Sequence, residues 1–269
     1  MAELQHEKGA CPPPIKIYPD KFAHHVVVIT GSGSGIGEAT ARLFAQQGAQ
    51  VVMLDIDEEK LRTIQASIIE TAGHPATDIH ICDVGDEQSV STAVAETVRK
   101  FGKIDVLINV AGIYPLHPLL AFPTDEYRRT RSTNLDGSFY LTRAVLPYMQ
   151  KAAYGRIIHT SSATFAGPLP GMTAYVASKA GIVGLVRAAS IEAGPGVTIN
   201  AVLPGLVETP GVLRHEGASE LFDTVVAKQV VKRRGQPGDI AHTFSFIASP
   251  EAAFYTGQTF NCSGGVNFN

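Results

Sequence analysis

The fold is predicted by one segment of the chain, Val26-Val27-Val28-Ile29-Thr30-Gly31-Ser32-Gly33-Ser34-Gly35-Ile36-Gly37. Its first part is a short, uninterrupted apolar run, which is typical of a strand that is buried on both faces. Its glycines allow a tight turn and let the backbone come close to a ligand. A helical pattern follows, with apolar residues at Ile36, Ala39, Leu43 and Phe44 and a stop at Gly48.

The same alternation of strand and helix continues to the end of the chain. Further short segments that fit strands lie at residues 51–54, 79–81, 106–108, 157–159, 197–199 and 258–260. Strands that alternate with helices through short loops specify a parallel sheet with helices on both faces and right-handed crossovers. The sequence therefore predicts an α/β fold, a single-domain, Rossmann-type, doubly wound parallel sheet of about seven strands.

Composition argues against several classes of function. The 269 residues are 45% apolar and carry a net charge of −3, and Lys232-Arg233-Arg234 is the only basic cluster, so no nucleic-acid partner is expected. No apolar run reaches the length that spans a bilayer, so no membrane partner is expected either. Cys11, Cys82 and Cys262 lie far apart without a CxxC pair, which argues against disulfides and a zinc site and favours a reducing, cytoplasmic location.

The glycine-rich turn has the context of a phosphate-binding loop. It lies between a strand and a helix, and the free N–H groups and positive dipole end of that helix can bind a pyrophosphate. Asp55 ends the second strand, where a carboxylate accepts hydrogen bonds from ribose hydroxyls. Such a carboxylate repels the extra phosphate of NADP, and the loop has no Arg or Lys to bind it. These residues predict a dinucleotide site that prefers NAD.

A second motif, Ala174-Tyr175-Val176-Ala177-Ser178-Lys179, can transfer a proton. It opens a helix, and its spacing places Tyr175 and Lys179 on one helix face. A free phenol has a pKa of ~10 and is a poor base at neutral pH. The ammonium of Lys179 is expected to lower the pKa of Tyr175, so that the tyrosine exchanges a proton with an alcohol or ketone oxygen. Taken alone, the pair also fits two exposed residues of an ordinary helix.

Several motifs, in their order and spacing, resemble those of the classical short-chain dehydrogenase/reductase family, from about Phe22 to the C-terminus. The matching motifs are residues 30–37, Asp83-Val84, Asn109-Val110-Ala111-Gly112, Asn134, Ser161-Ser162, Tyr175-Val176-Ala177-Ser178-Lys179 and Pro204-Gly205-Leu206-Val207-Glu208-Thr209. One departure is Val110, because the family commonly has two asparagines before Ala-Gly.

The resemblance implies the catalytic roles. Tyr175 would be the general acid/base, and Lys179 would lower its pKa and hold the nicotinamide ribose. Ser162 would hydrogen-bond the substrate oxygen, with its neighbour Ser161 as the competitor for that role. Asn134 would support a proton-relay water near Lys179. Ser162 and Tyr175 would thus be the residues that bind the substrate.

The resemblance also implies the cofactor contacts. Asp83 would contact the adenine, and the Val207 backbone and the Thr209 hydroxyl would hold the carboxamide. The full expected set is Gly31, Ser34, Gly35, Ile36, Gly37, Asp55, Ile56, Asp83, Val84, Asn109, Ala111, Gly112, Tyr175, Lys179, Pro204, Gly205, Val207 and Thr209. No metal ligands are expected. Family members usually pair long helices across subunits, which implies a homo-oligomer, a tetramer or a dimer.

The remaining segments complete the expected organisation. Residues 1–21 are expected to be an N-terminal arm without a secretory signal, and residues 22–269 the catalytic domain. Residues 206–232 combine glycines with scattered apolar side chains and predict a lid that closes over substrate. Tyr114, His117 and Phe165 follow strand ends and are candidates for the substrate pocket, although loop packing explains them equally well. The apolar lid favours a substrate that is partly apolar or aromatic.

The sequence therefore predicts an NAD(H)-dependent oxidoreductase that interconverts a secondary alcohol and a ketone, a small-molecule substrate. One alternative is a sensor or regulatory protein that binds NAD without turnover, and the presence of Ser162, Tyr175 and Lys179 argues against it. Another is a lyase or epimerase with NAD as a bound helper. Such relatives usually carry a larger substrate domain after the sheet.

Overall fold

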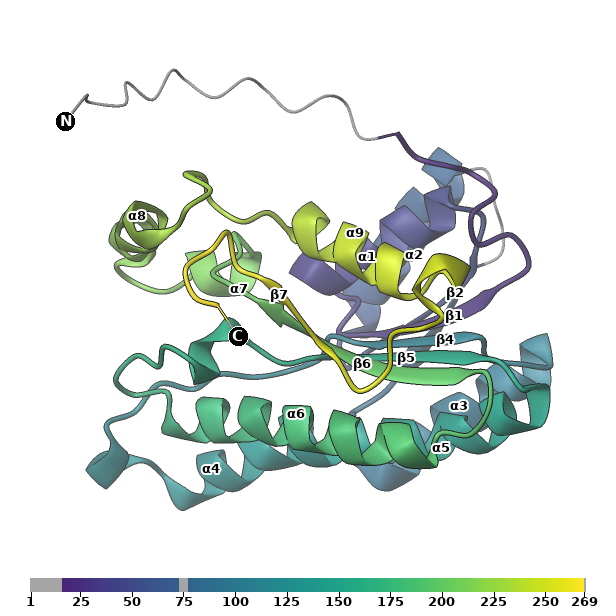
Figure 1. The fold of residues 1–269 in the computed structure, drawn as a ribbon, viewed down its shortest axis with the longest axis horizontal. Coiled ribbons are helices and arrows are strands. Elements are labelled where there is room, and N and C mark those ends of the chain that lie inside the picture. The colour runs from purple at the N-terminus through teal and green to yellow at the C-terminus, as the bar shows by residue number, and fades with distance from the viewer. Residues whose placement is uncertain (1–15, 73–76, 269) are drawn as a thin grey trace.

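The computed structural model describes residues 16–72 and 77–268, so most of the expected N-terminal arm, residues 1–21, lies outside the described residues. The described chain forms one parallel sheet between two layers of helices (Figure 1). Its strands are β1 Val26–Thr30, β2 Gln50–Asp55, β3 Thr77–Ile81, β4 Val106–Asn109, β5 Gly155–Thr160, β6 Val197–Pro204 and β7 Thr259–Cys262.

The order of the strands in the sheet is β3-β2-β1-β4-β5-β6-β7, and every pairing is parallel. The register aligns Val27 with Val51 on one side and with Val106 on the other. The strand order reverses between β1 and β4, and open α/β sheets bind ligands at the carboxyl ends of the strands at such a point. The predicted doubly wound sheet is confirmed.

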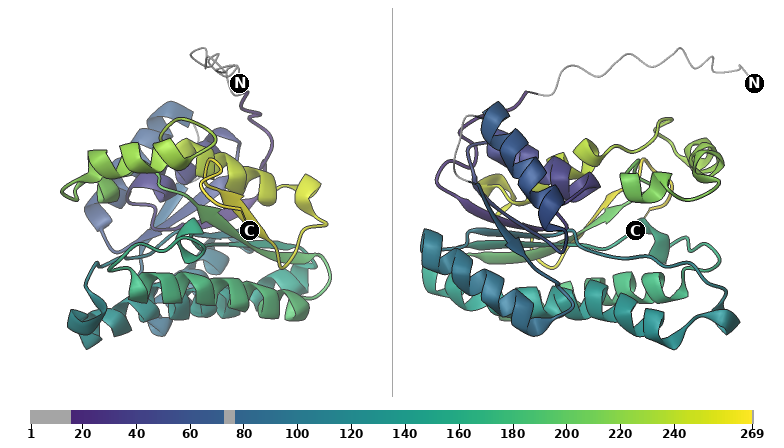
Figure 2. Two further views of the ribbon diagram at one scale, coloured as in Figure 1. Left: turned by 60° about the vertical axis from the view of Figure 1, so that its left-hand side comes forward. Right: turned by 180° about the vertical axis from the view of Figure 1, so that it is seen from behind.

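The helices cover both faces of the sheet, and further views show the same layers (Figure 2). One face carries α1 Gly35–Gln46, α2 Glu58–Ala72 and α9 Pro237–Ile247, and the other carries α3 Glu87–Phe101, α4 Thr124–Arg131, α5 Gly137–Ala152 and α6 Thr173–Glu192. The short α7 Pro210–Leu213 and α8 Ala218–Lys228 lie beyond one end of the sheet. Single turns are η1 Leu119–Ala121, η2 Ser132–Asp136, η3 Ala163–Phe165 and η4 Pro250–Ala252.

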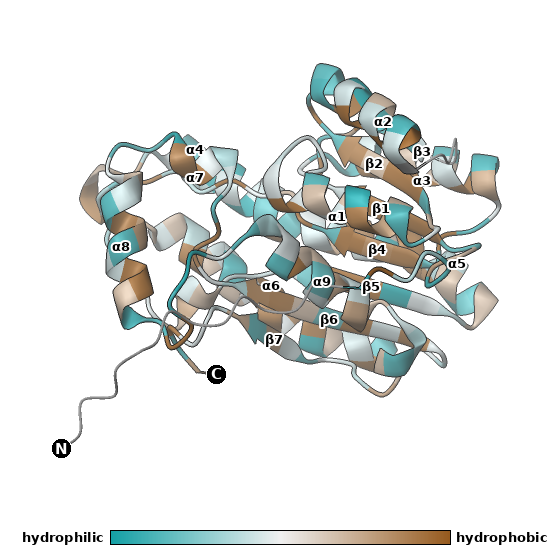
Figure 3. Cartoon of the chain, turned by 90° about the horizontal axis from the view of Figure 1, so that it is seen from above, coloured by the Kyte–Doolittle hydropathy of each residue, from teal (hydrophilic) through white to brown (hydrophobic). Residues whose placement is uncertain are grey.

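Each face of the sheet has its own hydrophobic core because side chains alternate along a strand. Val26 and Val28 of β1 pack into the core under α3, α5 and α6, whereas Val27 and Ile29 pack under α1, α2 and α9. The strands accordingly form a hydrophobic band beneath α1 and α9 (Figure 3). This two-sided burial explains the uninterrupted apolar runs.

Both ends of α3 are fixed by residues at its termini. The Asp86 side chain accepts a hydrogen bond from the Gln88 N–H at the start of the helix, as expected of an N-cap. Gly102 ends the helix in a left-handed conformation with φ of 77°. Both signals can be read from the sequence because they depend on neighbouring residues alone.

α6 is a long helix of the layer that covers one face of the sheet. With 20 residues and a mean hydropathy of 1.2, it is the one described helix long and apolar enough to cross a membrane. Lys179 and Arg187 interrupt its apolar residues, so the helix does not contradict the expectation that no apolar run reaches the length of a membrane span. In the structure α6 packs along β6 and buries Lys179, as a helix of the α/β layer does.

Candidate active site

A cavity of about 460 Å³ opens at the carboxyl ends of the strands, where the sequence places the cofactor. Predicted cofactor residues that line it are Gly31, Ser34, Gly35, Ile36, Asp55, Ile56, Asp83, Val84, Ala111, Gly112 and Thr209. Lining residues outside the predicted set are Cys82, Gly85, Val110, Ile113, Tyr114, Arg129, Ser132, Thr133 and Gly211. These come from neighbouring loops and from the end of α4, which no local sequence signal connects to the glycine loop.

The glycines of the loop are required by close approach of the backbone. Gly31 has a φ of +65°, and a Cβ there would lie 2.8 Å from the Ala111 nitrogen. A Cβ on Gly37 would collide with the carbonyl oxygen of Gly31, so this glycine lets α1 pack against the end of β1. Gly37 does not itself line the cavity. Side chains at Gly31 and Gly37 would therefore collide with neighbouring backbone, so the conformation of the loop requires glycine at both positions.

The N-terminus of α1 faces this cavity. Ser34 is the N-cap residue, and its side chain makes no capping hydrogen bond. The first N–H groups of a helix have no partner within the helix, and they carry the positive end of its dipole. Because Ser34 and Gly35 line the cavity, these N–H groups can hold an anionic pyrophosphate there.

Asp55 forms the wall of the cavity at the end of β2. Its Oδ2 accepts a hydrogen bond of 2.8 Å from the Gly33 N–H, and its Oδ1 accepts one of 3.1 Å from the Asp57 N–H. The carboxylate is therefore fixed against the glycine loop. Ribose hydroxyls can still donate to it, because each carboxylate oxygen accepts more than one hydrogen bond.

Asn109 lies beneath the cavity instead of lining it. The side chain is only 2% exposed, and its Oδ1 accepts from Thr30 while its Nδ2 donates to Ser138 and approaches His159. His159 is a fully buried core histidine, and burial lowers its pKa to about 3. The neighbouring Val110 lines the cavity in place of Asn109. Asn109 thus braces the strand ends that carry the cofactor loops.

Five other predicted cofactor residues also lie outside the cavity lining: Tyr175 and Lys179, described below, and Pro204, Gly205 and Val207. Pro204 ends β6, and a Cβ on Gly205 would lie 2.8 Å from the Ser263 Cα. Val207 is buried and forms an isolated β-bridge with Gly235. This segment is packed against the C-terminal residues, and of the predicted residues 204–209 it presents Thr209 to the cavity.

Asn134 lies in a π-helical turn between α4 and α5. Its Nδ2 donates to the Ile113 carbonyl and to Ser178 Oγ, and its Oδ1 accepts from the Ile113 N–H, each at 2.9 Å. Single π turns inside helices often occur at functional sites, and this one aims a fully buried side chain at the loop after β4. The turn could not be read from the sequence, because its letters fit an ordinary helix.

Lys179 projects from α6 to the edge of the cavity. Its Nζ donates a hydrogen bond of 2.7 Å to the Thr160 carbonyl and lies 5.7 Å from the centre of the Tyr175 ring. A Cβ on Gly112, which lines the cavity, would stand 3.2 Å from Lys179 Nζ and equally far from Asn134 Oδ1. The structure thus brings Lys179 and Asn134 together around Gly112. Burial lowers the pKa of Lys179 to about 8.

The pKa of Tyr175 departs from the sequence-based expectation. Burial raises it above its ordinary value, a hydrogen bond with Ser162 opposes the rise, and the nearby Tyr114 adds to it. The expectation that Lys179 lowers this pKa is wrong for the structure, because desolvation outweighs every attraction to the phenolate. Tyr175 is therefore a protonated phenol at neutral pH.

The two serines after β5 have different surroundings. Ser161 is buried, and its Oγ donates a hydrogen bond of 2.7 Å to the Lys179 carbonyl in α6. The Ser162 side chain instead caps η3 and contacts Tyr175. Of the two candidates for the hydroxyl beside the reacting oxygen, the structure favours Ser162.

Comparisons with known proteins agree with this geometry. The family model described as Enoyl-(Acyl carrier protein) reductase matches residues 31–267. The chain is 37% identical over 243 residues to 3-oxoacyl-[acyl-carrier-protein] reductase FabG of Thermotoga maritima. The aligned region covers 90% of this chain and 97% of that protein. The chain belongs to the classical short-chain dehydrogenase/reductase family.

Two further relatives lie within the same family. The chain is 37% identical to (2S)-[(R)-hydroxy(phenyl)methyl]succinyl-CoA dehydrogenase subunit BbsD of Thauera aromatica, over 90% of this chain and 96% of that protein. A solved structure of actinorhodin polyketide ketoreductase with NADPH superposes with a TM-score of 0.84 at 33% identity, over 91% of this chain and 98% of that chain. This short-chain dehydrogenase/reductase is therefore an oxidoreductase of a family that uses a nicotinamide cofactor.

Of the aromatic candidates for the substrate pocket, Tyr114 lies at the site. Its ring centre is 6.1 Å from that of Tyr175 and 5.5 Å from that of His215, and a Cβ on Gly211 would stand 2.7 Å from its hydroxyl. His117 instead pairs with Glu126, and its ring packs edge to face on Phe122. Phe165 packs against the hydrophobic core.

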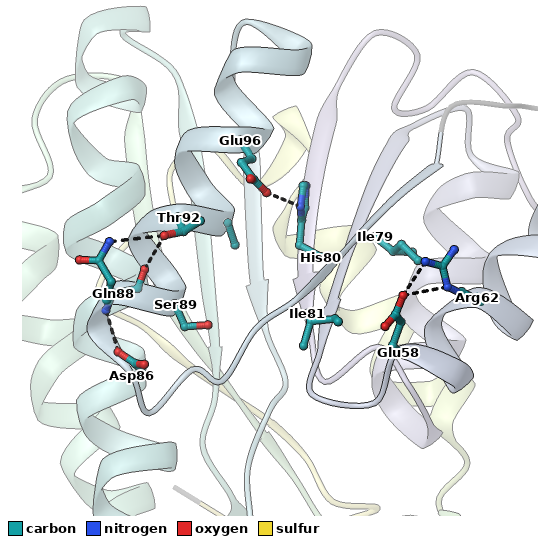
Figure 4. Close-up of a pocket in the computed structure, with 11 residues that line it drawn as sticks. Glu58, Arg62, Ile79, His80, Ile81, Asp86, Gln88, Ser89, Thr92 and Glu96 are labelled. Atoms are coloured by element: carbon teal, nitrogen blue, oxygen red, sulfur yellow. Dashed lines mark hydrogen bonds and ion pairs between the residues drawn. The ribbon is translucent and has the colours of Figure 1, made fainter.

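A second cavity, of about 490 Å³, lies between α2, β3 and α3 at the outer edge of the sheet (Figure 4). Four of its charged side chains form two pairs, Arg62 with Glu58 and His80 with Glu96, and Asp86 accepts a hydrogen bond from the Gln88 N–H. None of the predicted site residues lines it. The described residues include no group of three or more His, Cys, Asp or Glu that could hold a metal ion.

Proposed function

We propose that this protein is an NAD(H)-dependent oxidoreductase that interconverts a secondary alcohol and a ketone by hydride transfer. The observation that carries the proposal is the cluster of Asn134, Ser162, Tyr175 and Lys179 beside a glycine-lined cavity at the switch point of the sheet. Hydroxyl groups and an ammonium that converge next to a dinucleotide cavity suit proton transfer coupled to hydride transfer.

The cavity fits a nicotinamide dinucleotide. Gly31 to Gly37 and the N-terminus of α1 would hold the pyrophosphate, Asp55 the adenosine ribose, and Asp83 with Val84 the adenine. A Cβ on Gly35 would stand 3.1 Å from the Thr209 side chain, so Thr209 closes the opposite wall, where the carboxamide would lie. When bound, the nicotinamide ring supplies or accepts the hydride.

The proton moves through Tyr175 in this proposal. In ketone reduction the Tyr175 hydroxyl donates its proton to the carbonyl oxygen as that oxygen gains negative charge. Ser162 donates a hydrogen bond to the same oxygen, which stabilises the developing charge. Lys179 would hold the nicotinamide ribose, and Asn134 would support a relay water beside Lys179. Oxidation of an alcohol is the reverse, with Tyr175 accepting the proton.

The preference for NAD rests on Asp55. Its carboxylate would face the adenosine ribose hydroxyls and is held in place by the Gly33 and Asp57 N–H groups. A phosphate on that ribose would meet this negative charge at close range. The loop from Gly31 to Gly37 contributes no cationic side chain that would offset it. The solved structure of the actinorhodin ketoreductase contains NADPH, so the test of this proposal compares NAD(H) with NADP(H).

A partly apolar or aromatic substrate is favoured by the surroundings of Tyr175. Tyr114 and His215 place two more rings in a row with Tyr175. Flat rings of a substrate pack well against such side chains. The substrate for which the Thauera relative is named contains a phenyl group, which agrees with this choice.

Residues 206–232 are proposed as the lid over this pocket. They contain α7 and α8. The start of the segment contacts the residues just after its end, because Val207 forms a β-bridge with Gly235 and Glu208 pairs with Arg234 at 2.9 Å. Arg234 also lies 4.7 Å from the centre of the Phe222 ring of α8. Closing this segment would exclude water from the reacting oxygen.

Turnover with a panel of substrates tests the proposal. Reduced nicotinamide absorbance is followed for aryl, cyclic, sugar and steroid alcohols and ketones, with NAD(H) and NADP(H) in parallel. The expected result is turnover of an aryl or cyclic class, with a higher kcat/KM for NAD(H). Binding of NADH without turnover of any member would contradict the proposal and favour a protein that senses NAD.

A further inference from the structure

Ser162 is held by one neighbour through two hydrogen bonds. Its Oγ accepts from the Thr164 backbone N–H at 3.2 Å and from the Thr164 Oγ1 hydroxyl at 2.8 Å. Both bonds arise because Ser162 caps η3, which turns the chain directly after β5 and brings Thr164 back over the serine. Ser162 is 5% exposed, so few water molecules can compete for its hydroxyl.

These bonds determine what the Ser162 hydroxyl can still do. A serine hydroxyl has two acceptor positions and one proton to donate. The two groups of Thr164 fill both acceptor positions, so the proton of Ser162 is its only remaining hydrogen-bonding capacity. Ser162 therefore acts as a donor toward its other contact, Tyr175, and toward any oxygen that lies between them.

We propose that Thr164 is a positioning residue, which fixes Ser162 as a hydrogen-bond donor to the reacting oxygen. The inference rests on the proposed function, in which Ser162 donates to that oxygen. A hydroxyl that accepts hydrogen bonds becomes a stronger donor, because neighbouring bonds polarise one another. Thr164 thus strengthens the bond to an oxygen that gains negative charge and orients it before the substrate arrives.

Loss of the Thr164 hydroxyl has a specific consequence for Tyr175. The Ser162 oxygen would regain an acceptor position, and the Tyr175 hydroxyl could then donate to it. That bond would direct the tyrosine proton away from the substrate and favour the protonated phenol. Without Thr164, the pKa of Tyr175 is therefore expected to rise further and the rate of proton transfer to fall.

The test compares Thr164→Val, which keeps the shape and removes the hydroxyl, with Thr164→Ser, which keeps the hydroxyl. Thr164→Val is expected to lower kcat about 3- to 10-fold, the equivalent of one neutral hydrogen bond, with KM for NADH unchanged. Thr164→Ser is expected to restore most of the loss. Thr198→Val, a buried threonine in β6 whose hydroxyl has no partner among the described residues, is the matched control and should leave kcat unchanged.

Two further measurements separate positioning from a general structural role. In a Ser162→Ala background, Thr164→Val should cause no further loss of kcat, because Thr164 acts on the reaction through Ser162. Ultraviolet titration of the tyrosines, with a Tyr175→Phe variant subtracted, should show a higher pKa of Tyr175 in Thr164→Val and the parental pKa in Thr164→Ser.

The titration does not depend on turnover, so it distinguishes the two proposals. A shifted titration in a protein that turns over no alcohol or ketone would sustain the inference on Thr164 while the proposed function fails. Equal titrations in all variants, or an equal loss of kcat in the Thr164→Val and Thr198→Val variants, would overturn the inference.

Discussion

The surroundings of Tyr175 favour the protonated form of its phenol. Burial raises its pKa, and the bond with Ser162 opposes this only in part. The sequence places Tyr175 and Lys179 on one helix face correctly, but the spacing alone carries no information on how much water each side chain loses. Desolvation depends on the packing of β5, α6 and the loop after β4, and it decides the sign of the shift.

The raised pKa of Tyr175 predicts how the rate depends on pH. A protonated phenol is the acid that ketone reduction needs, so kcat/KM for reduction should stay high through neutral pH and fall above the pKa of Tyr175, beyond 10. Alcohol oxidation needs the base, so its kcat/KM should rise toward alkaline pH. Steady-state rates in both directions across pH 6 to 11 check this, because kcat/KM reports the free enzyme. A reduction rate that falls between pH 6 and 8 would contradict the assignment.

Buried Lys179 is predicted to lower the free energy of unfolding at neutral pH, although turnover requires it. Its pKa is lowered to about 8 in the fold, so between pH 8 and 10.5 the unfolded state binds more protons and the free energy of unfolding rises with pH. Replacement by methionine should remove this rise and increase the free energy of unfolding at pH 7 by up to about 3 kcal/mol, while turnover is lost. Denaturant unfolding at pH 7 and pH 9.5 measures both effects. A less stable Lys179→Met variant at pH 7 would show that the bond to Thr160 outweighs the burial cost.

At the scale of elements, the strands and helices follow the sequence closely because both cores have a strong periodic signal. Three details of the site cannot be predicted from that periodic signal. Asn109 is turned into the interior by its bonds to Thr30 and Ser138, and the turn at Asn134 is π-helical. Tyr114, in the loop after β4, lies with its ring centre 6.1 Å from that of Tyr175 in α6. All three depend on contacts between distant segments.

The contact between α1 and the end of β1 predicts the effect of a single methyl group. Gly37→Ala would place a Cβ against the Gly31 carbonyl, so α1 must shift and distort the phosphate loop. We expect lower thermal stability and a loss of NADH affinity of 10-fold or more. Gly238→Ala in α9 is the matched control, because nothing lies within 4 Å of its added Cβ. Fluorescence titration of NADH and thermal unfolding compare the two, and equal NADH affinity in both variants would contradict the role of this contact.

At the scale of the whole molecule, the face formed by α4, α5 and α6 carries exposed apolar side chains. Tyr127, Phe139, Tyr148 and Ile191 are all exposed there. Clustered apolar side chains on a surface often mark an interface between proteins. A second copy of this chain is the expected partner, so light scattering after size-exclusion chromatography should give the mass of a dimer or tetramer. Phe139→Glu should lower that mass, whereas a monomeric parent would contradict the expectation.

Turnover of NAD(H) by the parent protein and by Tyr175→Phe, with NADH binding measured for both, decides whether Tyr175 carries the proton. The account predicts that the parent reduces a ketone with NADH and that Tyr175→Phe binds NADH as tightly but loses at least 100-fold in kcat, the usual contribution of a general acid. Undiminished turnover in Tyr175→Phe would show that another group carries the proton and would contradict the account.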